Sequence, residues 1–395
     1  MKVLAIGGGG SMGRAVIRAI QSFDFVEQVV LAGLDFDRAS RFAASLNDSR
    51  FSARYLDISN AQDLREAIRA CDVVLNSAGP FFRFGVPVLQ AAIDEAKHYC
   101  DICDDWQPTL EMLALHEQAV QKGITAVIGL GASPGIANML AMKATQQLDQ
   151  VDTLYSAWRL SNAHNEDDGF FEEGEAAASA DAAAVHLVHC LTETIPLRQD
   201  GQVQDHLPLA SHRFNYPGYG WMDLWSIGHP EAVTFPRQFP SLKNCINGML
   251  GVGEIVDDLR ALAEDVRSGS LSVDQAAVGL MDNGGRDQRR AQLMQNEDAH
   301  APGIMAYAEG LKDGLPLRVG ATLKRVPEGG MSAVTGIPLA LFLPLLSQHA
   351  IRGPGVMSPE QAVDPDAFFA LLDGFTGSEG CGLTLSCEGD VERVP

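Results

Sequence analysis

Residues 2–20 read KVLAIGGGGSMGRAVIRAI, and this stretch decides the fold of the N-terminal part of the chain. A short apolar run ends in four glycines, and a helix-forming run begins at Arg14. Backbone N–H groups in such a turn can approach a pyrophosphate at the positive end of a helix, so the stretch predicts a dinucleotide-binding turn. Both Gly8-x-Gly10-x-x-Gly13 and Gly7-x-x-Gly10-x-x-Gly13 fit, and a plain glycine-rich turn is the alternative. The predicted cofactor contacts here are Gly7, Gly8, Gly10, Ser11, Met12 and Gly13.

Short apolar runs and helical patterns alternate outward from this turn to about residue 130. The expected strands are 3–6, 29–34, 53–56, 73–76, 98–102 and 124–128. The expected helices are 13–23, 38–46, 61–70, 86–95 and 108–121. This alternation predicts βαβ units and a doubly wound parallel sheet, a Rossmann domain.

Further positions in this region bear on dinucleotide binding. Asp35 ends the second expected strand, where a carboxylate accepts from the adenosine ribose and favours NAD over NADP. Arg38 weakens that preference, so NADP stays possible. Asp57 ends the third strand and either accepts from the adenine amino group or caps the next helix. Small residues after the fourth strand would let a nicotinamide ribose pass, or they form an ordinary Gly-Pro turn; they include Asn76, Ala78, Gly79 and Pro80.

The chain changes character after residue 135. A strand is expected over 151–160, an alanine-rich helix over 176–191, and strands again near 303–308 and 315–323. Residues 241–290 look wholly helical, with a capping box at Ser272-x-x-Gln275. A final helical part follows Ser332, and the apolar segment 337–346 is expected to be a buried core helix because it is too short to span a membrane.

Composition excludes several classes of function. Against 29 Lys and Arg stand 51 Asp and Glu, a formal net charge of −22, so neither nucleic acid nor a membrane surface is an expected partner. The seven cysteines are odd in number and scattered, which fits a reducing cytoplasm better than a disulfide framework. The first residues lack the features of a signal peptide, and we expect a cytoplasmic protein.

Several runs resemble the saccharopine dehydrogenase-like oxidoreductase superfamily. These are 72–80, 86–92, 98–101 with its Tyr-x-Asp strand end, 123–135 with its closing Pro-Gly, and the C-terminal runs 335–338, 355–360 and 368–372. The resemblance covers the two ends of the chain and is poor in the middle. Saccharopine- and carboxynorspermidine-forming members carry Asp before the Pro-Gly, where this chain has Ser133, so the loop is more similar to the lysine ε-dehydrogenase-like branch.

The resemblance implies a fold, a cofactor and an activity. The fold is a Rossmann domain of residues 1–133 completed by 331–395, with an α+β substrate and dimerisation domain over 134–330 that carries a helical insert at about 241–297. The cofactor is NAD or NADP, and the substrate is a small amine or amino acid. A homodimer is expected. We assign substrate contacts to Tyr99, Asp104, Ser133 and Asn138.

Hydride transfer also needs a group that moves the second proton. Asp101, at the strand end beside Tyr99, is expected to face the mouth of the crevice, and a structural hydrogen bond to loop amides is its alternative. Asp104 and Asp105 would continue an acidic rim, or cap the helix after Pro108. His229 suits proton transfer near neutral pH, or is part of the loop scaffold.

Other motifs favour ordinary structural roles, and we expect no metal site. Cys100-x-x-Cys103 lies at a strand end without further zinc ligands, and His186-x-x-His189 lacks a third ligand nearby. The acidic run from Glu166 to Glu175, with Phe170 and Phe171, is either a solvated face or a lid for a cationic substrate.

The sequence therefore predicts an NAD(P)-dependent oxidoreductase acting on a C–N bond of an amino-acid-derived or polyamine-derived substrate, assisted by Asp101 or His229. A dinucleotide-binding protein with a redox-sensing or no catalytic role is one alternative. Reduction of a C=C bond, as in the enoyl-reductase-like branch, is the other.

Overall fold

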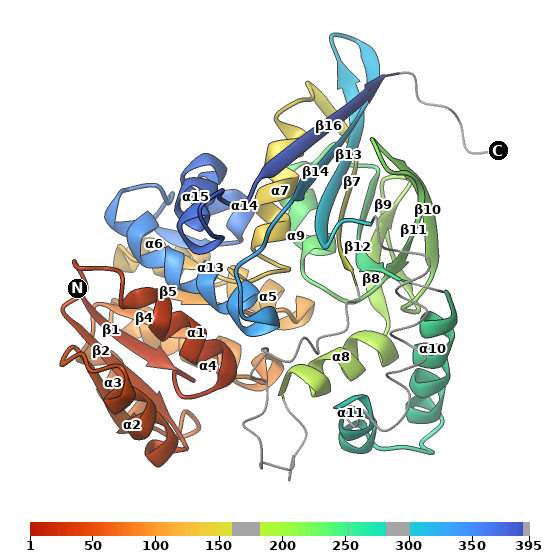
Figure 1. The fold of residues 1–395 in the computed structure, drawn as a ribbon. Coiled ribbons are helices and arrows are strands. Elements are labelled where there is room, and N and C mark those ends of the chain that lie inside the picture. The colour runs from red at the N-terminus through yellow and green to blue at the C-terminus, as the bar shows by residue number, and fades with distance from the viewer. Residues whose placement is uncertain (160–181, 252, 282–300, 390–395) are drawn as a thin grey trace. The chain divides into compact units, whose positions relative to one another are not determined.

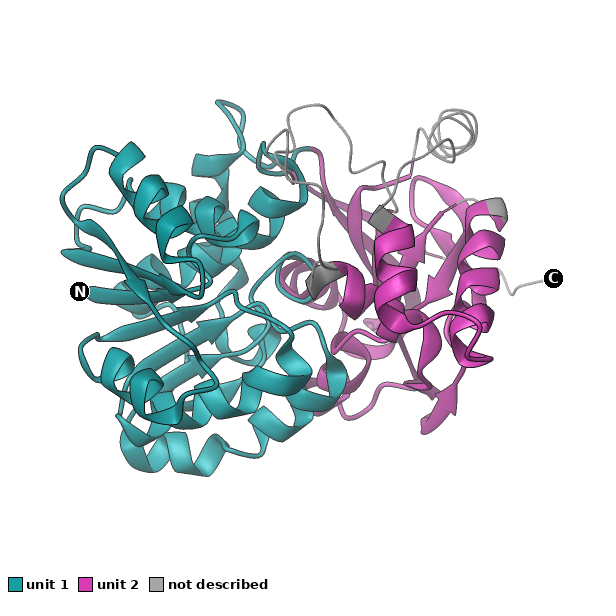
Figure 2. Cartoon of the chain, turned by 90° about the horizontal axis from the view of Figure 1, so that it is seen from below, with its two compact units in different colours: residues 1–136, 166–170, 325–381 teal, residues 137–165, 171–324, 382–395 magenta. Residues whose placement is uncertain are grey.

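The structure is a computed structural model that forms two compact units (Figure 2), and each unit is described by itself. It describes residues 1–159, 182–251, 253–281 and 301–389. Unit 1 comprises 1–136 and 325–381. The described part of unit 2 comprises 137–159, 182–251, 253–281, 301–324 and 382–389.

Unit 1 contains a parallel sheet whose described strands run in the order β3-β2-β1-β4-β5-β6-β15 (Figure 1). Their bounds are β1 (Lys2–Ile6), β2 (Gln28–Gly33), β3 (Phe51–Tyr55), β4 (Val73–Asn76), β5 (His98–Asp101), β6 (Thr125–Val127) and β15 (Gly355–Met357). The direction of strand addition reverses between β1 and β4, and β15 joins from the C-terminal part of the chain. This is the expected doubly wound Rossmann sheet, and its switch point lies at the end of β1.

Helices cover this sheet. They are α1 (Ser11–Ile20), α2 (Phe36–Ser45), α3 (Ala61–Arg69), α4 (Phe81–Asp94), α5 (Trp106–Leu113), α6 (His116–Lys122), α13 (Gly330–Ser347), α14 (Pro359–Ala362), α15 (Pro365–Leu372) and the short 3₁₀ helix η1 (Asp373–Phe375). Helices α1 and α13 pack side by side (Figure 1), while α4 packs against both α3 and α5. Right-handed crossovers on either side of the switch point place these two groups on opposite faces of the sheet.

Helix α13 is the expected core helix. It is long and apolar enough to cross a membrane, and most of it is buried within the protein. A Cβ at Gly336 would lie 2.6 Å from the Met12 carbonyl oxygen and 3.0 Å from the Ala15 Cβ, so a glycine is needed where α13 crosses α1. This contact ties the C-terminal helix to the first turn of the helix that follows the glycine loop.

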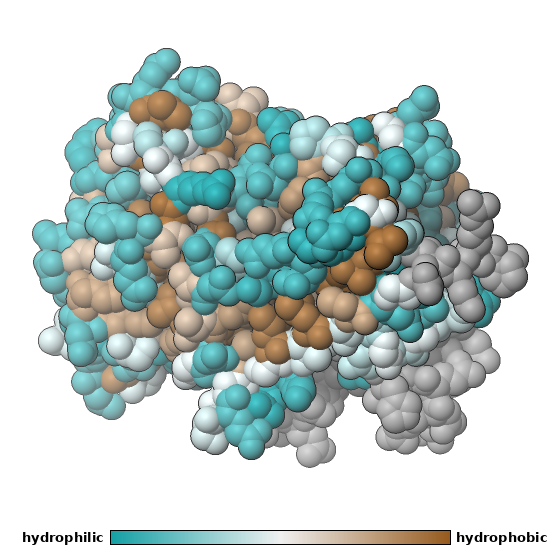
Figure 3. All heavy atoms as spheres, turned by 90° about the horizontal axis from the view of Figure 1, so that it is seen from above, coloured by the Kyte–Doolittle hydropathy of each residue, from teal (hydrophilic) through white to brown (hydrophobic). Residues whose placement is uncertain are grey.

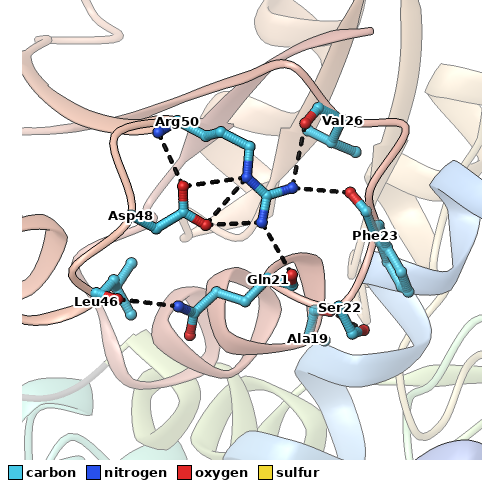
Figure 4. A network of polar contacts seen from close by, with 8 residues as sticks. All are labelled: Ala19, Gln21, Ser22, Phe23, Val26, Leu46, Asp48 and Arg50. Carbon is cyan, nitrogen blue, oxygen red and sulfur yellow. Dashed lines mark hydrogen bonds and ion pairs between the residues drawn. The ribbon is translucent and has the colours of Figure 1, made fainter.

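Arg50 closes the connection between α1 and β2 (Figure 4). Its guanidinium donates to the carbonyl oxygens of Gln21, Phe23 and Val26 and pairs with the Asp48 carboxylate at 2.7 Å. The pairing lowers the pKa of Asp48, chiefly through the side-chain hydrogen bond. One side chain thus bonds to three carbonyl groups of this connection, of which that of Phe23 also accepts from the Val26 N–H.

Unit 2 contains a mixed sheet with the main order β10-β11-β12-β7-β13-β14-β16, and β8 and β9 extend from β12. The strands are β7 (Gln150–Arg159), β8 (Ile195–Gln199), β9 (Gln202–His206), β10 (Ser211–Tyr216), β11 (Gly220–Ser226), β12 (Asn244–Leu250), β13 (Ile304–Lys312), β14 (Leu315–Leu323) and β16 (Leu383–Gly389). The β12–β7 pair is parallel, and the other pairs in this sheet are antiparallel.

Five described helices accompany this sheet: α7 (Ile136–Thr145), α8 (Ala182–Thr192), α9 (Glu231–Gln238), α10 (Gly253–Arg267) and α11 (Val273–Met281). Helix α8 packs against α10 and α11, and α9 packs against β8 and β12. A buried cluster of side chains from this sheet forms the core and includes the aromatic residues Phe214, Tyr216 and Tyr307. The expected α+β second domain is therefore confirmed.

Most apolar side chains lie in these cores rather than on the surface. Figure 3 shows one face of the molecule, where hydrophilic residues alternate with smaller apolar areas. Such a mixture is ordinary for a folded protein surface.

The expectation that residues 241–290 are wholly helical is wrong. Residues 244–250 form β12, an inner strand paired with β7 and β11 and almost completely buried. A short apolar run buried on both faces has no alternation, so periodicity cannot separate it from a helix. Within the expected insert, the described helices are α10 and α11, and residues 282–297 lie outside the described residues.

Two other boundaries differ from expectation. The helix expected over 108–121 is two helices, α5 and α6, and the helix expected from Val86 begins at Phe81. At the C-terminus, β16 pairs with β14 and so lies in unit 2, whereas 331–395 as a whole was expected to complete the Rossmann domain. Backbone pairing with β14, distant in sequence, places this strand.

Candidate functional site

The glycine loop follows β1 and meets α1 with almost no free space. Gly7 adopts φ +80°, and its N–H donates to the Ala32 carbonyl oxygen at 2.8 Å. A Cβ at Gly13 would overlap the Gly7 carbonyl oxygen and lie 2.7 Å from the Gly8 Cα. The close approach of helix to turn therefore requires glycine at position 13, as the predicted dinucleotide loop demands.

The N-terminus of α1 presents backbone donors at this turn. Gly10 is the N-cap, with extended backbone and no side-chain cap, and the Arg14 N–H is already bonded to the Gly10 carbonyl oxygen. The N–H groups of Ser11, Met12 and Gly13 come before the first intrahelical bond and have no partner within the helix. Together with the positive end of the helix dipole they suit a pyrophosphate.

The second predicted cofactor loop, residues 76–80, touches the first. A Cβ at Gly7 would lie 2.8 Å from Ser77 Oγ and 2.9 Å from the Ala78 nitrogen. Ser77 holds the loop there, since both its N–H and its hydroxyl donate to the Ile6 carbonyl oxygen, at 2.9 and 3.1 Å. The structure thus brings the glycine loop and the 76–80 loop together at the switch point of the sheet.

A buried polar chain runs across the ends of β4 and β5. The Asn76 amide donates to the Tyr99 hydroxyl at 3.2 Å, and that hydroxyl donates to Asp101 Oδ2 at 2.8 Å. At the other end of the chain, Asn76 Oδ1 accepts from the Ala78 N–H at 3.1 Å. Side chains of Asn76, Tyr99 and Asp101 are fully buried. The chain therefore connects the 76–80 loop to the strand end that carries Asp101.

Asp101 also holds the loop that follows β6. Its Oδ1 accepts from the N–H groups of Gly129 at 2.7 Å and Cys103 at 3.0 Å, and its backbone carbonyl accepts from Leu130. The expectation that Asp101 faces the mouth of the crevice is wrong, because these loop amides enclose the carboxyl completely. Burial raises its pKa to about 6, against the lowering effect of the three hydrogen bonds. A catalytic role for Asp101 stays a prediction, and the structural hydrogen bonds that were its alternative are present.

The rest of the 98–105 segment is packed rather than exposed. Burial raises the pKa of both the Cys100 and Cys103 thiols, which makes reactive thiolates unfavourable. Asp105 is the N-cap residue of α5 without a side-chain cap bond to that helix, and its carboxylate instead accepts from the Phe82 N–H of α4 at 3.1 Å. Asp104 is half-buried. No disulfide joins the seven cysteines, all of which lie within the described ranges.

The carboxylates predicted for the adenosine half lie at the ends of β2 and β3. Asp35 is exposed and caps α2 by accepting the Arg38 N–H at 2.9 Å through one oxygen. A carboxylate offers about four lone-pair sites, so this bond leaves acceptor capacity for a ribose hydroxyl. Asp57 accepts from the N–H and hydroxyl of Ser59, which lower its pKa, and Asn60 is the cap of α3. Asp57 therefore does not cap that helix.

Two residues of α13 lie against the glycine loop and its helix α1, and against the 129–135 loop. Gly336 lies over Met12, as described above, and a Cβ at Gly131 would lie 3.1 Å from the Thr335 methyl group. Thr335 and Gly336 belong to the C-terminal run on which the family resemblance rests, but the sequence did not mark them as site residues. Their distance along the chain from Met12 hides the contact from any local pattern.

The remaining candidates lie partly in unit 2. Ser133 is half-buried in the 129–135 loop, and Asn138 is fully buried in α7. His229, 7% exposed, precedes α9, and its Nε2 lies 3.3 Å from the Nε2 of His186. Their substrate and proton-transfer roles stay predictions. The acidic run 166–175 lies outside the described residues.

The structure also revises the reading of the α8 histidines. His189 pairs with Glu193 at 2.8 Å. His186 instead meets Cys190, one helical turn later, with Nε2 and Sγ 3.2 Å apart. The missed signal was the i, i+4 spacing of His186 and Cys190, which places both side chains on one helix face.

Comparisons with known proteins agree with this architecture. Residues 3–127 match the family model for the saccharopine dehydrogenase NADP binding domain. The chain is 25% identical to carboxynorspermidine synthase of Vibrio cholerae over 94% of each chain. It is 30% identical to a saccharopine dehydrogenase-like oxidoreductase of Rattus norvegicus over 27% of this chain and 25% of that one.

A solved structure shows the same fold over the whole chain. It is apo saccharopine dehydrogenase (L-Glu forming) from Saccharomyces cerevisiae, with a TM-score of 0.64 at 17% identity over 99% of this chain and 100% of that one. The matched residues 3–127 include the glycine loop, the 76–80 loop and the buried polar chain of Asn76, Tyr99 and Asp101. In sequence and in fold this chain is therefore similar to saccharopine dehydrogenase-like oxidoreductases, and these comparisons support an NAD(P)-dependent oxidoreductase.

Proposed function

We propose that this enzyme transfers a hydride between NAD(P) and the carbon of a C–N bond in a small amino-acid-derived or polyamine-derived substrate. The observation that carries the proposal is the junction of the glycine loop with the 76–80 loop at the switch point, where both Gly7 and Gly13 leave no room for a Cβ. The C–N bond is supported by relatives named for saccharopine and carboxynorspermidine, which are products with secondary amines.

This chain's own residues provide the cradle for the dinucleotide. The N–H groups that begin α1 would bind the pyrophosphate, and Asp35 would accept from the adenosine ribose. We propose NAD as the preferred form on account of Asp35, with NADP as the second. The cofactor, when bound, supplies or accepts the hydride.

The second proton requires an acid–base group, and Asp101 and His229 are the two predicted residues. A carboxyl whose pKa is about 6 can exchange a proton near neutral pH, and a histidine does so by its ordinary pKa. If Asp101 titrates in the catalytic step, Asp101→Asn removes the acidic limb of the pH profile of kcat/KM. If His229 does so, His229→Gln removes that limb, and Asp101→Asn leaves it in place.

The excess of negative charge supports a cationic substrate. The net charge of −22 favours the approach of amines over that of carboxylates or phosphates. We further propose a cytoplasmic homodimer; free cysteines suit the reducing compartment, and the dimer rests on the family resemblance.

The test has two arms that use the full chain. Binding of NAD and NADP is measured first by calorimetry, with Gly13→Ala as the binding-deficient variant and Gly374→Ala as its control. Gly374 lies in the same unit, and a Cβ there meets no atom within 4 Å. A panel of amino-acid, polyamine and enoyl substrates is then followed at the nicotinamide absorbance.

We expect turnover with an amine or with the matching carbonyl–amine pair. Turnover with enoyl substrates only would replace the proposal by C=C reduction. Dinucleotide binding without turnover of any substrate would replace it by a binding or redox-sensing role.

A further inference from the structure

Three side chains of types that bind metal ions meet inside unit 2. His186 and Cys190 come from α8, and His229 comes from the segment between β11 and α9. Ligand atoms of the three residues all lie within 4.8 Å of one another. All three residues are buried: the exposed fraction is 9% for His186, 4% for Cys190 and 7% for His229. The cluster therefore joins His186 and His229, which are 43 positions apart in the chain.

The spacing of these atoms is that of ligands around one ion. His186 Nε2 lies 3.3 Å from His229 Nε2 and 3.2 Å from Cys190 Sγ. For Zn–N bonds of about 2.05 Å and a Zn–S bond of about 2.3 Å, tetrahedral geometry separates two nitrogens by about 3.3 Å and nitrogen from sulfur by about 3.6 Å. The nitrogen pair has this spacing already, and the Sγ needs to move by only about 0.4 Å.

The local scaffold holds the three ligands in place. His186 and Cys190 are separated by one helical turn, so they project from the same face of α8. The Sγ of Cys190 lies 3.6 Å from the Gly228 carbonyl oxygen, next to His229 in the chain. The His229 ring packs near Trp158 on β7, with ring centroids 6.2 Å apart. Helix α8, the segment before α9 and Trp158 of β7 therefore hold the three ligand side chains in position.

We propose that His186, Cys190 and His229 form a binding site for a divalent zinc ion. Two imidazoles and one thiolate are the ligand types that Zn²⁺ takes in proteins, and three protein ligands leave one tetrahedral position for water or another group. On binding, the Cys190 thiol loses its proton to solvent and the sulfur lone pair forms the bond to zinc, with no change of oxidation state. The ion offsets the cost of a buried thiolate.

A zinc ion at this site is not part of the proposed reaction, and it excludes His229 as the acid–base group. A zinc ion on His229 Nε2 occupies the lone pair that a general base would use. With zinc bound, Asp101 is the remaining predicted proton carrier. Zinc binding is measured without substrate, so failure of this inference and failure of the proposed function are separate results.

The experiment uses the full chain with any affinity tag removed, purified under reducing conditions and stripped with a chelator. Zn²⁺ is added, the protein is dialysed against metal-free buffer, and bound metal is counted by plasma mass spectrometry. Co²⁺ is added to a second sample, because a cobalt–thiolate bond produces a charge-transfer absorption band. We expect one zinc ion per chain and that band with cobalt.

Variants assign the ion to the three residues. Cys190→Ser is expected to lose the charge-transfer band, and His186→Ala and His229→Ala are expected to bind zinc at least tenfold more weakly. His189→Ala is the matched control, since it lies on the same helix but pairs with Glu193. Far-UV circular dichroism and NAD binding check that each variant folds; if His229→Ala does not fold, His229→Gln takes its place.

Three results would overturn the proposal. They are failure of the wild-type chain to retain zinc, a cobalt complex without the thiolate band, and zinc binding that is equal in Cys190→Ser and His189→Ala. In each case the three side chains form a buried hydrogen-bond cluster only.

Discussion

Replacing Asp101 by asparagine removes a carboxyl whose ionisation destabilises the folded chain. The Asp101 carboxyl is completely buried, and burial raises its pKa from the ordinary 3.8 to about 6. A carboxyl that holds its proton more tightly in the folded chain leaves stability unchanged below pH 3.8. It lowers the free energy of unfolding as the pH rises from there to about 6, and the loss is complete above that pH.

The magnitude follows from the gap between the two pKa values, which is about 2.2. At about 1.36 kcal/mol for each pH unit, ionisation of Asp101 lowers the free energy of unfolding by about 3 kcal/mol at high pH. Between about pH 4 and pH 7.5 the expected loss is about 2 kcal/mol, because the carboxyl is already partly ionised in the unfolded chain at pH 4. The Asp101→Asn variant lacks this loss, since an amide does not titrate.

The assay is urea denaturation of both proteins at these two pH values, followed by circular dichroism and tryptophan fluorescence. Every other titrating group is shared, so the difference between the two proteins isolates Asp101. The new amide presents a donor to Tyr99 at both pH values, and this constant cost cancels. We expect the wild-type chain to lose about 2 kcal/mol relative to the variant as the pH rises.

Asp149→Asn is the control with the opposite sign. Asp149 accepts from the Lys312 ammonium and the Asp313 N–H, which lower its pKa. Its ionised form therefore stabilises the fold; because this gain comes mostly as the pH rises toward 3.8, the wild-type chain should gain only slightly on this variant between pH 4 and pH 7.5. A difference for Asp101 that stays constant within about 0.5 kcal/mol, or that has the sign of the Asp149 control, would refute the burial argument.

Three further substitutions test the packing around the site. Gly13→Ala should weaken NAD binding at least tenfold, because the new Cβ meets the Gly7 carbonyl oxygen; calorimetry against Gly374→Ala checks this, and equal affinities would contradict it. Tyr99→Phe should lower the free energy of unfolding by about 1 to 3 kcal/mol, since Asn76 and Asp101 each lose a buried partner, and an unchanged urea midpoint would argue against the chain of bonds. Arg50→Ala should lower the free energy of unfolding by about 2 kcal/mol because three carbonyl groups lose the guanidinium donor, although that of Phe23 keeps the Val26 N–H. The exposed Arg41→Ala should have little effect on the urea midpoint, and a similar effect of both variants would contradict a role of the Arg50 hydrogen bonds in stability.

The sequence alone determined the features that depend on neighbouring residues. The strand, glycine turn and helix of residues 2–20 predicted the dinucleotide loop, and alternation of short apolar runs with helical patterns predicted the parallel sheet. Both signals are local, because a turn needs its glycines at fixed offsets and a helix or strand has a period within a few residues. The family resemblance then supplied the cofactor class, which the comparisons confirm.

Only the tertiary structure decided which side chains meet. The sequence placed Asp101 at a strand end, but the loop amides of Cys103 and Gly129 enclose it and make it a buried acceptor. His229 and His186 were separate candidates until the fold brought their Nε2 atoms to 3.3 Å. Such contacts come from elements that pack after they form, and the packing is set by whole helix and sheet faces rather than by any short pattern. The dinucleotide loop could therefore be predicted from the sequence, and the candidate zinc site could not.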